Sequence, residues 1–527
     1  MDRSSDQPIA AAPPERSENR LATRLLWLLA LVVFIVSVTL WSPFSDGRMA
    51  VIDPVLYAQG VEAAESLTND PELGATNANH ILYHFALFGL TRGFESLGIS
   101  HPGHHATQVL SGLGTALCVL LLGLLAGPER RWVGLACAAV LVSMRGSFYH
   151  ACGGETVPLA TALSLATLFL ASKDRPSLVA VGLTLGAAFL ARQDSIFITP
   201  AVFVLLIGRV RFWPMVVAFA AAGAMPVATW YLAWSANDAV NSIATFKDFV
   251  LGIGNHGTFS FAEIVGLSSP HLLAVAFHNA FVPQIDALDS VPVALGLVPI
   301  TLLAGVAFVW RGRSGGRNTR LLAAFATLFV CRQSFFLWFE PQNWEWQVPL
   351  VAMGLGLLAR STRGEAISSA GLRRLGGVAL VVFGACVFSL HLPASLRARH
   401  DHLDQSVETA VAAAGSEAQY LCLGFKPFRL AGWRGFDSVK LDDAHSFTAL
   451  PSRWRDWPVN VLPFARAQGV DVVLLVDVFV RNGQPYTRQA LGDAVQLASD
   501  PRVVESDELT FLWHDGRLFG LWAHPKR

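Results

Sequence analysis

Long stretches without a single charged residue are the feature that most limits what this chain can fold into. Five of them reach the length of about 20 residues that a helix needs to cross the hydrocarbon core of a bilayer; they are Leu25–Ser45, Gly103–Pro128, Phe212–Asn237, Ser290–Trp310 and Leu375–Leu396. Shorter apolar runs lie between them, at Trp132–Tyr149, Thr156–Ser172, Pro176–Ala191, Ser195–Gly208, Leu321–Trp338 and Gln347–Ala359. The sequence therefore predicts a mainly α, polytopic helical membrane protein with about eleven transmembrane helices.

The scarcity of charge also excludes several classes of protein. Charged residues make up 15% of the 527 residues and hydrophobic residues 53%, whereas a soluble chain has about 25% and about 45–50%. A large soluble enzyme and a disordered or fibrous protein are therefore excluded. The 39 basic and 39 acidic residues balance, so we expect no nucleic-acid partner. The six cysteines are scattered and form neither a disulfide framework nor a zinc-site spacing.

The distribution of Lys and Arg predicts the orientation in the membrane. With the N-terminus in the cytoplasm, 18 basic residues fall on the inner side and six on the outer segments before residue 396. The opposite orientation would invert this ratio and violate the positive-inside rule. We therefore expect a multi-pass protein of the inner (cytoplasmic) membrane, with its N-terminus in the cytoplasm.

Composition divides the chain into three parts. Residues 1–20 are polar and are expected to be a disordered cytoplasmic N-terminus. Residues 21–395 form the transmembrane domain, whose outer loop 42–102 contains two short amphipathic helices, Val55–Ser66 and Ile81–Leu97. Residues 396–527 are expected to form a small extracytoplasmic α/β domain. Its predicted strands lie at 420–425 and 470–480, followed by a hairpin of 510–513 with 518–522, and its predicted helices at 401–414 and 488–498.

The charged and imidazole side chains at the outer ends of the spans are the candidates for chemistry. Such groups are costly near lipid and usually have partners or a function. The topology brings to one leaflet the acids and bases Asp53, Glu155, Arg192, Asp194, Arg332 and Glu340, together with the imidazoles of His80 and His84. A shared outer position is what an active site at the membrane–water boundary requires.

Each candidate also has a purely structural interpretation. Asp53 before Pro54 is a good helix start, and Glu155 and Asp194 would suit helix N-termini. Arg192 and Asp194 would neutralise each other. His80 and His84 have the spacing of a metal pair on one helix face, but two His without an acidic third ligand are weak evidence for a metal.

Five short motifs make the chain resemble the GT-C class of membrane glycosyltransferases, in particular the bacterial relatives of protein mannosyltransferases and of lipid A aminoarabinose transferase. They are Ile52–Tyr57 and Asn79–His84 in the first outer loop, Gly153–Pro158 after the third span, Ala191–Ser195 before a short apolar helix, and Asn343–Pro349 late in the chain. The last motif is only loosely similar, because Trp or Glu stands where the class has Arg.

The resemblance implies transfer of a sugar from a polyprenyl-phosphate donor to an extracytoplasmic acceptor, which is a glycan, lipid or protein. It implies that Asp53 is the general base and that Glu155 orients the acceptor or a divalent cation. Arg192, Arg332 and His80 would then bind the donor phosphate. The substrate cleft would include Tyr57, Tyr83, His84, Asp194 and Glu340. No cofactor is certain, and the class leaves open a divalent metal ion held by Asp53, Glu155 and His80.

Two other functions fit the same sequence. A polytopic transporter also places charges among its helices, although it would carry them in mid-span rather than at the outer ends. A non-catalytic GT-C-like scaffold, whose exported domain binds a partner, is the third interpretation.

Overall fold

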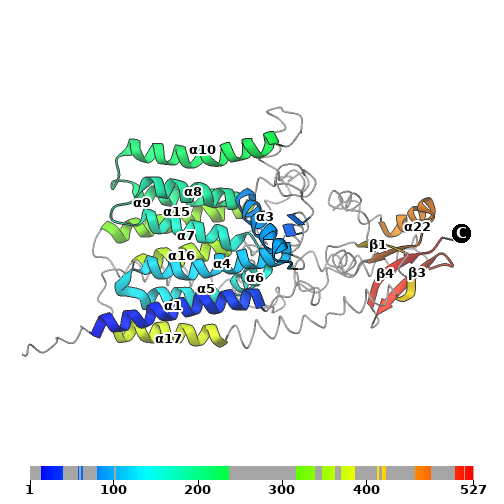
Figure 1. Ribbon diagram of the computed structural model, residues 1–527, viewed down its shortest axis with the longest axis horizontal. Coiled ribbons are helices and arrows are strands. Elements are labelled where there is room, and N and C mark those ends of the chain that lie inside the picture. The colour runs from blue at the N-terminus through cyan, green and yellow to red at the C-terminus, as the bar shows by residue number, and fades with distance from the viewer. Residues whose placement is uncertain are drawn as a thin grey trace, which may run out of the picture.

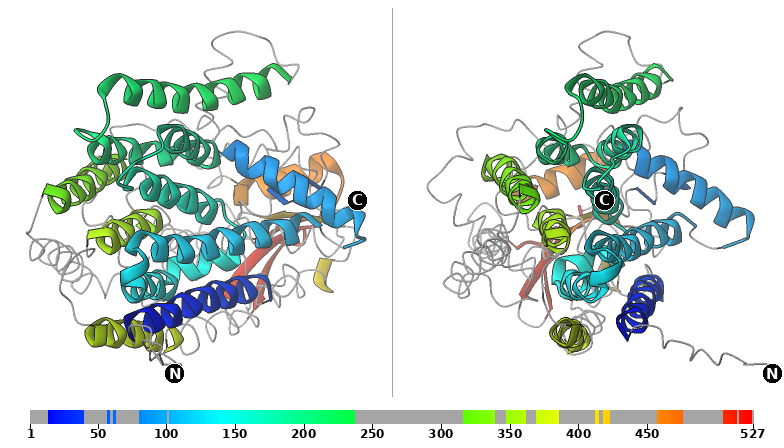
Figure 2. Two further views of the ribbon diagram at one scale, coloured as in Figure 1. Left: turned by 60° about the vertical axis from the view of Figure 1, so that its left-hand side comes forward. Right: turned by 90° about the vertical axis from the view of Figure 1, so that its left-hand side faces the viewer.

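The computed structural model describes residues 14–39, 57–58, 61–62, 80–99, 102–236, 316–338, 347–361, 369–385, 412–414, 418–422, 457–475, 505–514 and 517–525. Most of these residues form helices that lie side by side, with their axes along one common direction (Figures 1 and 2). In chain order the longer helices are α1 (Pro14–Thr39), α4 (Pro102–Ala126), α5 (Arg131–Ser143), α7 (Val157–Ala171), α8 (Leu178–Ala191), α10 (Phe212–Ala236), α15 (Gly316–Trp338), α16 (Gln347–Ser361) and α17 (Ser369–Ala385). Helix α3 (Ile81–Ser96) lies obliquely at one end of this bundle.

Helix α4 is the centre of the bundle, because it contacts α1, α3, α5, α7 and α16. Small residues allow these close contacts. A Cβ atom added at Gly114 would lie 2.6 Å from the backbone nitrogen of Leu159 in α7, and one added at Gly134 in α5 would lie 2.6 Å from Cα of Gly123. Within a bilayer, burial of apolar surface contributes little to helix association. Small residues at helix crossings instead allow the two backbones to approach closely.

Several predicted spans are confirmed as apolar helices. Among the described residues, the segments Asn19–Thr39, His105–Ala126 and Phe212–Ala233 are long and apolar enough to cross a membrane. Three shorter apolar helices, Val157–Ala171, Leu178–Ala191 and Gln193–Leu206, follow the predicted runs. The run Ser290–Trp310 lies outside the described residues, so the number of about eleven spans stays a prediction.

The apolar run Trp132–Tyr149, which we expected to be a span, does not form one continuous helix. The chain breaks at Met144, whose extended backbone separates α5 from α6 (Arg145–Gly153), and the two pieces form an angle of 79°. The break falls where the apolar run gives way to Arg145, Gly146 and Ser147. Gly and Ser are poor helix formers, and the polar run favours a turn at the bundle end. Helix α6 therefore lies at the end of the bundle rather than continuing through it.

The N-terminal part also differs from our expectation. Helix α1 begins at Pro14, so residues 14–20, which were expected to be disordered, are helical. Proline is favoured in the first turn of a helix, and the Glu and Arg residues that follow are good helix formers. Residues 1–13 lie outside the described residues.

Arginine side chains bind the backbone at the bundle end opposite α3. Arg209 donates to the carbonyl oxygen of Ala171 at 3.0 Å, and Arg360 donates to that of Ser172 at 2.7 Å. Arg131 donates in the same way to Gly123 of α4 at 2.6 Å. These carbonyls lie at or near helix C-termini, where cations are favourable. Arg131, Arg209 and Arg360, which were assigned to the inner side, thus share one end of the bundle.

The C-terminal part contains a small mixed sheet with the strand order β1-β2-β4-β3. Strand β1 (Gln419–Cys422) pairs in parallel with β2 (Val472–Leu475), and β4 (Arg517–Ala523) pairs antiparallel with β2 and with β3 (Leu509–His514). The predicted hairpin is confirmed, since His514 pairs with Arg517 across the turn. Helix α22 (Trp457–Gln468), which we did not predict, covers the sheet with Val461 and Ala465.

The helices expected at 401–414 and 488–498 lie outside the described residues, apart from 412–414. The position of this domain relative to the membrane, and the two domain boundaries, stay predictions.

Candidate functional site

Four segments far apart in the sequence meet at the bundle end where α3 lies. They are the start of α3, the junction between α6 and α7, the turn after α8, and the last third of α15. Each segment supplies polar side chains that are buried or partly buried. The meeting of these segments at helix ends is what the outer-face topology predicted.

Asp194 joins two of these segments through a pair of buried ion pairs. Arg192 Nε donates to Asp194 Oδ1 at 2.9 Å, and Arg332 Nη2 donates to Asp194 Oδ2 at 2.6 Å. The three side chains are at most 9% exposed. Such charge-assisted hydrogen bonds are strong, and burial strengthens them further.

The local sequence explains how Arg192 and Asp194 reach this position. Helix α8 ends at Ala191, Arg192 is extended, and the 3-10 helix η3 (Gln193–Ile198) follows and leads into α9 (Thr199–Leu206). Pro200 in the first turn of α9 is compatible only with a helix start. The backbone therefore turns at residues 192–194, at the end of the bundle.

The junction between α6 and α7 places Glu155 beside this cluster. Gly154 ends α6 in the left-handed conformation with φ 75°, which favours glycine. The carbonyl of Gly154 accepts a hydrogen bond from the Tyr83 hydroxyl at 2.7 Å, and that of Glu155 accepts one from Ser111 at 2.8 Å. The Glu155 side chain is 2% exposed. The next residue, Thr156, accepts a hydrogen bond from Arg192 Nη1 at 3.3 Å, so the junction and the arginine pair form one network.

A group of aromatic and imidazole rings borders the same region. The Tyr57 ring lies edge-on to His84, with 4.7 Å between the ring centroids, and it also contacts His80 and Tyr83. Burial lowers the pKa of His84 to about 3. Burial, together with the nearby Arg192, lowers the pKa of His80 to about 3 as well. Both imidazoles are therefore neutral near pH 7. Among the described residues, neither ring nitrogen of His84 has a hydrogen-bond partner.

Eight of the ten predicted site residues are brought together at this end of the bundle. Asp53 and Glu340 lie outside the described residues. The eight placed residues are Tyr57, His80, Tyr83, His84, Glu155, Arg192, Asp194 and Arg332. Their roles stay predictions, since geometry alone assigns none of them.

The ion pair between Arg192 and Asp194 supports the purely structural interpretation of these two residues. Asp194, however, also binds a second arginine, Arg332. No local pattern indicated that Arg332 binds Asp194, because the two residues lie 138 positions apart. We also missed Thr156, although it directly follows Glu155. The sequence pattern that could have indicated Thr156 is a hydroxyl side chain next to an acid at a helix start.

The predicted metal set is only partly described. In the described part of the chain, no three His, Cys, Asp or Glu side chains form a group that would hold a metal ion. Asp53, the expected third ligand beside Glu155 and His80, lies outside that part.

No known family pattern and no curated protein sequence matches this chain. Solved structures do match it. The apo structure of ArnT from Cupriavidus metallidurans aligns with a TM-score of 0.54 and 13% identity, over 96% of this chain and 99% of ArnT. The structure of the same protein bound to undecaprenyl phosphate gives a TM-score of 0.50 and 12% identity over the same shares.

An oligosaccharyltransferase from Archaeoglobus fulgidus also matches, with a TM-score of 0.48, 13% identity, and coverage of 96% of this chain and 74% of that one. The likeness to ArnT extends over nearly the full length of both chains. The chain therefore shares the overall fold of ArnT, in agreement with the fold that the resemblance of its motifs implied.

Proposed function

We propose that this protein is a membrane glycosyltransferase that moves a sugar from a polyprenyl-phosphate donor to an extracytoplasmic glycan, lipid or protein. The observation that most supports the proposal is the buried pair Arg192 and Arg332, held by Asp194 beside Glu155 at one end of the bundle.

The arginine pair suits the departing group of this reaction. Negative charge develops on the lipid phosphate as the sugar leaves, and fixed cationic donors stabilise that charge most where water is excluded. Arginine binds phosphate oxygens through a planar fork of N–H donors. Asp194 holds both forks in place.

The fold supports the same class of donor. ArnT, whose fold this chain shares, has been crystallised with undecaprenyl phosphate bound. In our proposal His80, which is neutral, donates or accepts a hydrogen bond at the phosphate. We also assign Tyr57, Tyr83, His84 and Glu340 to the border of the substrate cleft.

The acceptor side of the reaction needs a carboxylate. A general base must lie within hydrogen-bond reach of the acceptor hydroxyl or amine whose proton it removes. We assign this role to Asp53, and we assign the orientation of the acceptor to Glu155. The polar cluster lies at helix ends, which favours transfer at the membrane surface over a transport pathway through the midplane.

The test is transfer of a labelled sugar from a polyprenyl-phosphate donor by the purified protein, with an envelope extract as the source of acceptors. Asp53→Asn is expected to abolish transfer while undecaprenyl phosphate still binds. Arg332→Gln is expected to weaken that binding by about tenfold or more, because it removes a charged hydrogen-bond donor.

Glu95→Gln, at an exposed ion pair of α3, is the matched control and should leave both readouts unchanged. Size-exclusion profiles of all variants show whether they are folded. Full transfer by Asp53→Asn would refute the base assignment, and unchanged lipid binding by a folded Arg332→Gln variant would refute the phosphate site.

A further inference from the structure

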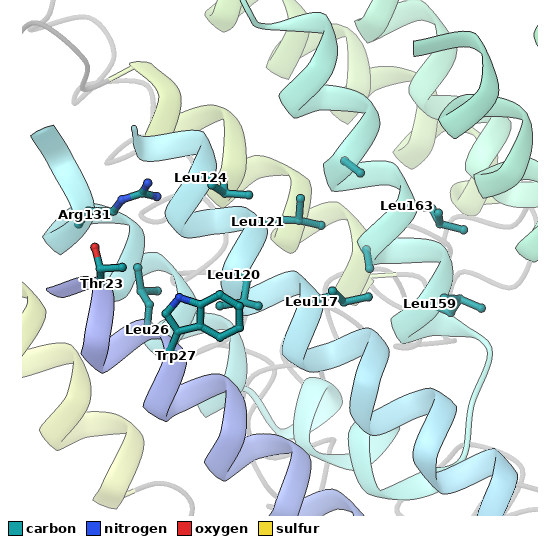
Figure 3. A pocket seen from close by; sticks show the side chains of 12 residues that line it. Thr23, Leu26, Trp27, Leu117, Leu120, Leu121, Leu124, Arg131, Leu159 and Leu163 are labelled. Carbon is teal, nitrogen blue, oxygen red and sulfur yellow. The ribbon is translucent and has the colours of Figure 1, made fainter. Parts of the chain in front are cut away.

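A second candidate binding site is an apolar groove on the surface of the bundle, and its Arg131 end lies at the bundle end opposite the polar cluster (Figure 3). Helix α1 supplies Leu26 and Trp27, α4 supplies four leucines, and α7 supplies two leucines and two alanines. The groove encloses about 380 Å³, within the range of about 300–1,000 Å³ that is usual for small-molecule sites. Trp27 is 62% exposed, so the groove is open to the surroundings of the helices.

One end of the groove carries a positive charge. Figure 3 shows Arg131 beside Thr23 and Leu124, whereas Leu159 and Leu163 mark the opposite end. Arg131 uses Nη1 for the carbonyl of Gly123, which leaves most of the five guanidinium N–H donors of an arginine for other partners. Within the described part of the chain, Arg131 forms no ion pair with a carboxylate. A guanidinium next to an apolar surface is best satisfied by an anion.

The length and position of the groove indicate which molecule fits it. From Leu117 to Leu124 the groove follows about two turns of α4, which rise by about 10 Å. This is less than half of the hydrocarbon core of about 30 Å, so the occupant comes from a single leaflet. Arg131 belongs to the bundle end where Arg209 and Arg360 bind helix carbonyls. The charge asymmetry predicts that this is the cytoplasmic side.

We propose that this groove binds an anionic phospholipid of that leaflet, with the phosphate on Arg131 and one acyl chain along the leucines of α4. Basic pockets between transmembrane helices on the cytoplasmic side are suited to anionic head groups. Trp27 lines the groove, so its indole contacts the acyl chain of the bound lipid in this proposal. The fluorescence of Trp27 then reports on that contact. The site is independent of the proposed transferase chemistry.

Quenching of Trp27 fluorescence by lipids with brominated acyl chains tests the proposal. The full-length protein is placed in phosphatidylcholine nanodiscs that contain a small, fixed fraction of either brominated phosphatidylglycerol or brominated phosphatidylcholine. The Trp27 signal is the difference between each protein and the same protein with Trp27→Phe. One cationic contact is expected to give an apparent affinity for the anionic lipid that is about fivefold higher than for phosphatidylcholine.

Arg131→Gln should abolish this preference, and Arg131→Lys should keep most of it. Arg24→Gln is the matched control, because Arg24 of α1 is exposed at the same end of the bundle but does not line the groove. Ala166→Phe fills the groove and leaves Arg131 in place, so it should reduce quenching by both lipids. This variant tests whether lipid occupies the groove if Arg131→Gln does not fold.

Equal quenching of the unmodified protein by the two brominated lipids would overturn the proposal. So would a loss of preference in Arg24→Gln together with its survival in Arg131→Gln, since general surface charge would then explain the result. Protection of Trp27 from both lipids, with a dimer in cross-linking, would assign the groove to a second copy of the chain instead.

Discussion

Asp194 is the residue on which the burial of two arginines depends. Arg192 and Arg332 are 6% and 1% exposed at their side chains, and Asp194 accepts a hydrogen bond from each. Removing one partner of a buried ion pair leaves a desolvated charge without compensation. Asp194→Asn is therefore expected to lower the free energy of unfolding by about 3–5 kcal/mol, measured by denaturation of the protein in detergent.

The exposed pair of Arg92 and Glu95 supplies the control for that measurement. Its side chains are 34% and 54% exposed, and a surface pair within one helix contributes only about 0.5 kcal/mol. Glu95→Gln should therefore leave stability nearly unchanged. Equal effects of Asp194→Asn and Glu95→Gln would show that the buried cluster is not held by its charges.

His84 makes the stability of this region depend on pH. Its pKa is lowered from 6.5 to about 3 because the ring is buried. Below pH 6.5 the imidazole of His84 binds a proton in the unfolded chain but not in the folded chain. The free energy of unfolding therefore decreases as the pH is lowered below 6.5, and it is constant above pH 6.5. Between pH 6.5 and about 5, this one group should lower the free energy of unfolding by about 2 kcal/mol.

Replacement of His84 by Phe removes the titrating group and keeps a ring against Tyr57. Unfolding measured from about pH 7 to about pH 5 should then show a shallower loss of stability than in the unmodified protein. The same slope in both proteins would mean that His84 is protonated without disrupting the fold.

At the scale of single residues, the sequence predicted which side chains gather but not how they pair. Glu155, Arg192, Asp194 and Arg332 were selected because each lies at the outer end of an apolar run. Their common location follows from helix length alone. The contact between Arg332 and Asp194 depends on how α15 packs against η3 and α9, which no local pattern encodes.

The helices themselves were predicted best where an apolar run is long and bounded by charge. Helices α4 and α10 follow the predicted runs within two residues at each end. The break between α5 and α6 was missed, because hydropathy averaged over a span does not register a turn at one residue such as Met144. That turn matters for the site, since it places α6 and the following Glu155 at the end of the bundle.

Close packing of α4 against α7 is the element-scale feature that most directly supports Glu155. A methyl group at Gly114 would lie 2.6 Å from Leu159 N and 2.7 Å from Pro158 C, both backbone atoms. Gly114→Ala is therefore expected to push the two helices apart and to lower the free energy of unfolding by about 1–3 kcal/mol. It should also lower sugar transfer, because Glu155 immediately precedes α7.

Gly223 in α10 is the matched control, because nothing lies within 4 Å of a Cβ atom added there. Gly223→Ala should leave stability unchanged or raise it by up to about 1 kcal/mol, since alanine is the better helix former. A destabilisation of similar size in both variants would indicate a general effect of the added methyl group rather than a helix contact.

At the scale of the whole molecule, the bundle has two chemically different ends. One carries arginines bound to helix carbonyls, and the other carries the acids, imidazoles and paired arginines of the candidate site. Hydropathy and charge predicted this division, because both depend on position along the membrane normal. They did not predict the neighbours of each helix, which depend on contacts between distant segments such as that of Gly114 with Leu159.

The division of the two ends makes the orientation in the membrane testable with single cysteines. Glu95 in α3 and Asp174 between α7 and α8 are both exposed and lie at opposite ends of the bundle. In intact cells, Glu95→Cys should react with a membrane-impermeant maleimide. Asp174→Cys should react only after permeabilisation, because the basic residues around it predict a cytoplasmic position. Cys118 and Cys137 are buried, and the unmodified protein measures the background from the remaining cysteines. The reverse labelling pattern would place the candidate site in the cytoplasm, where an acceptor outside the cell is out of reach, and would therefore refute both the topology and the proposed reaction.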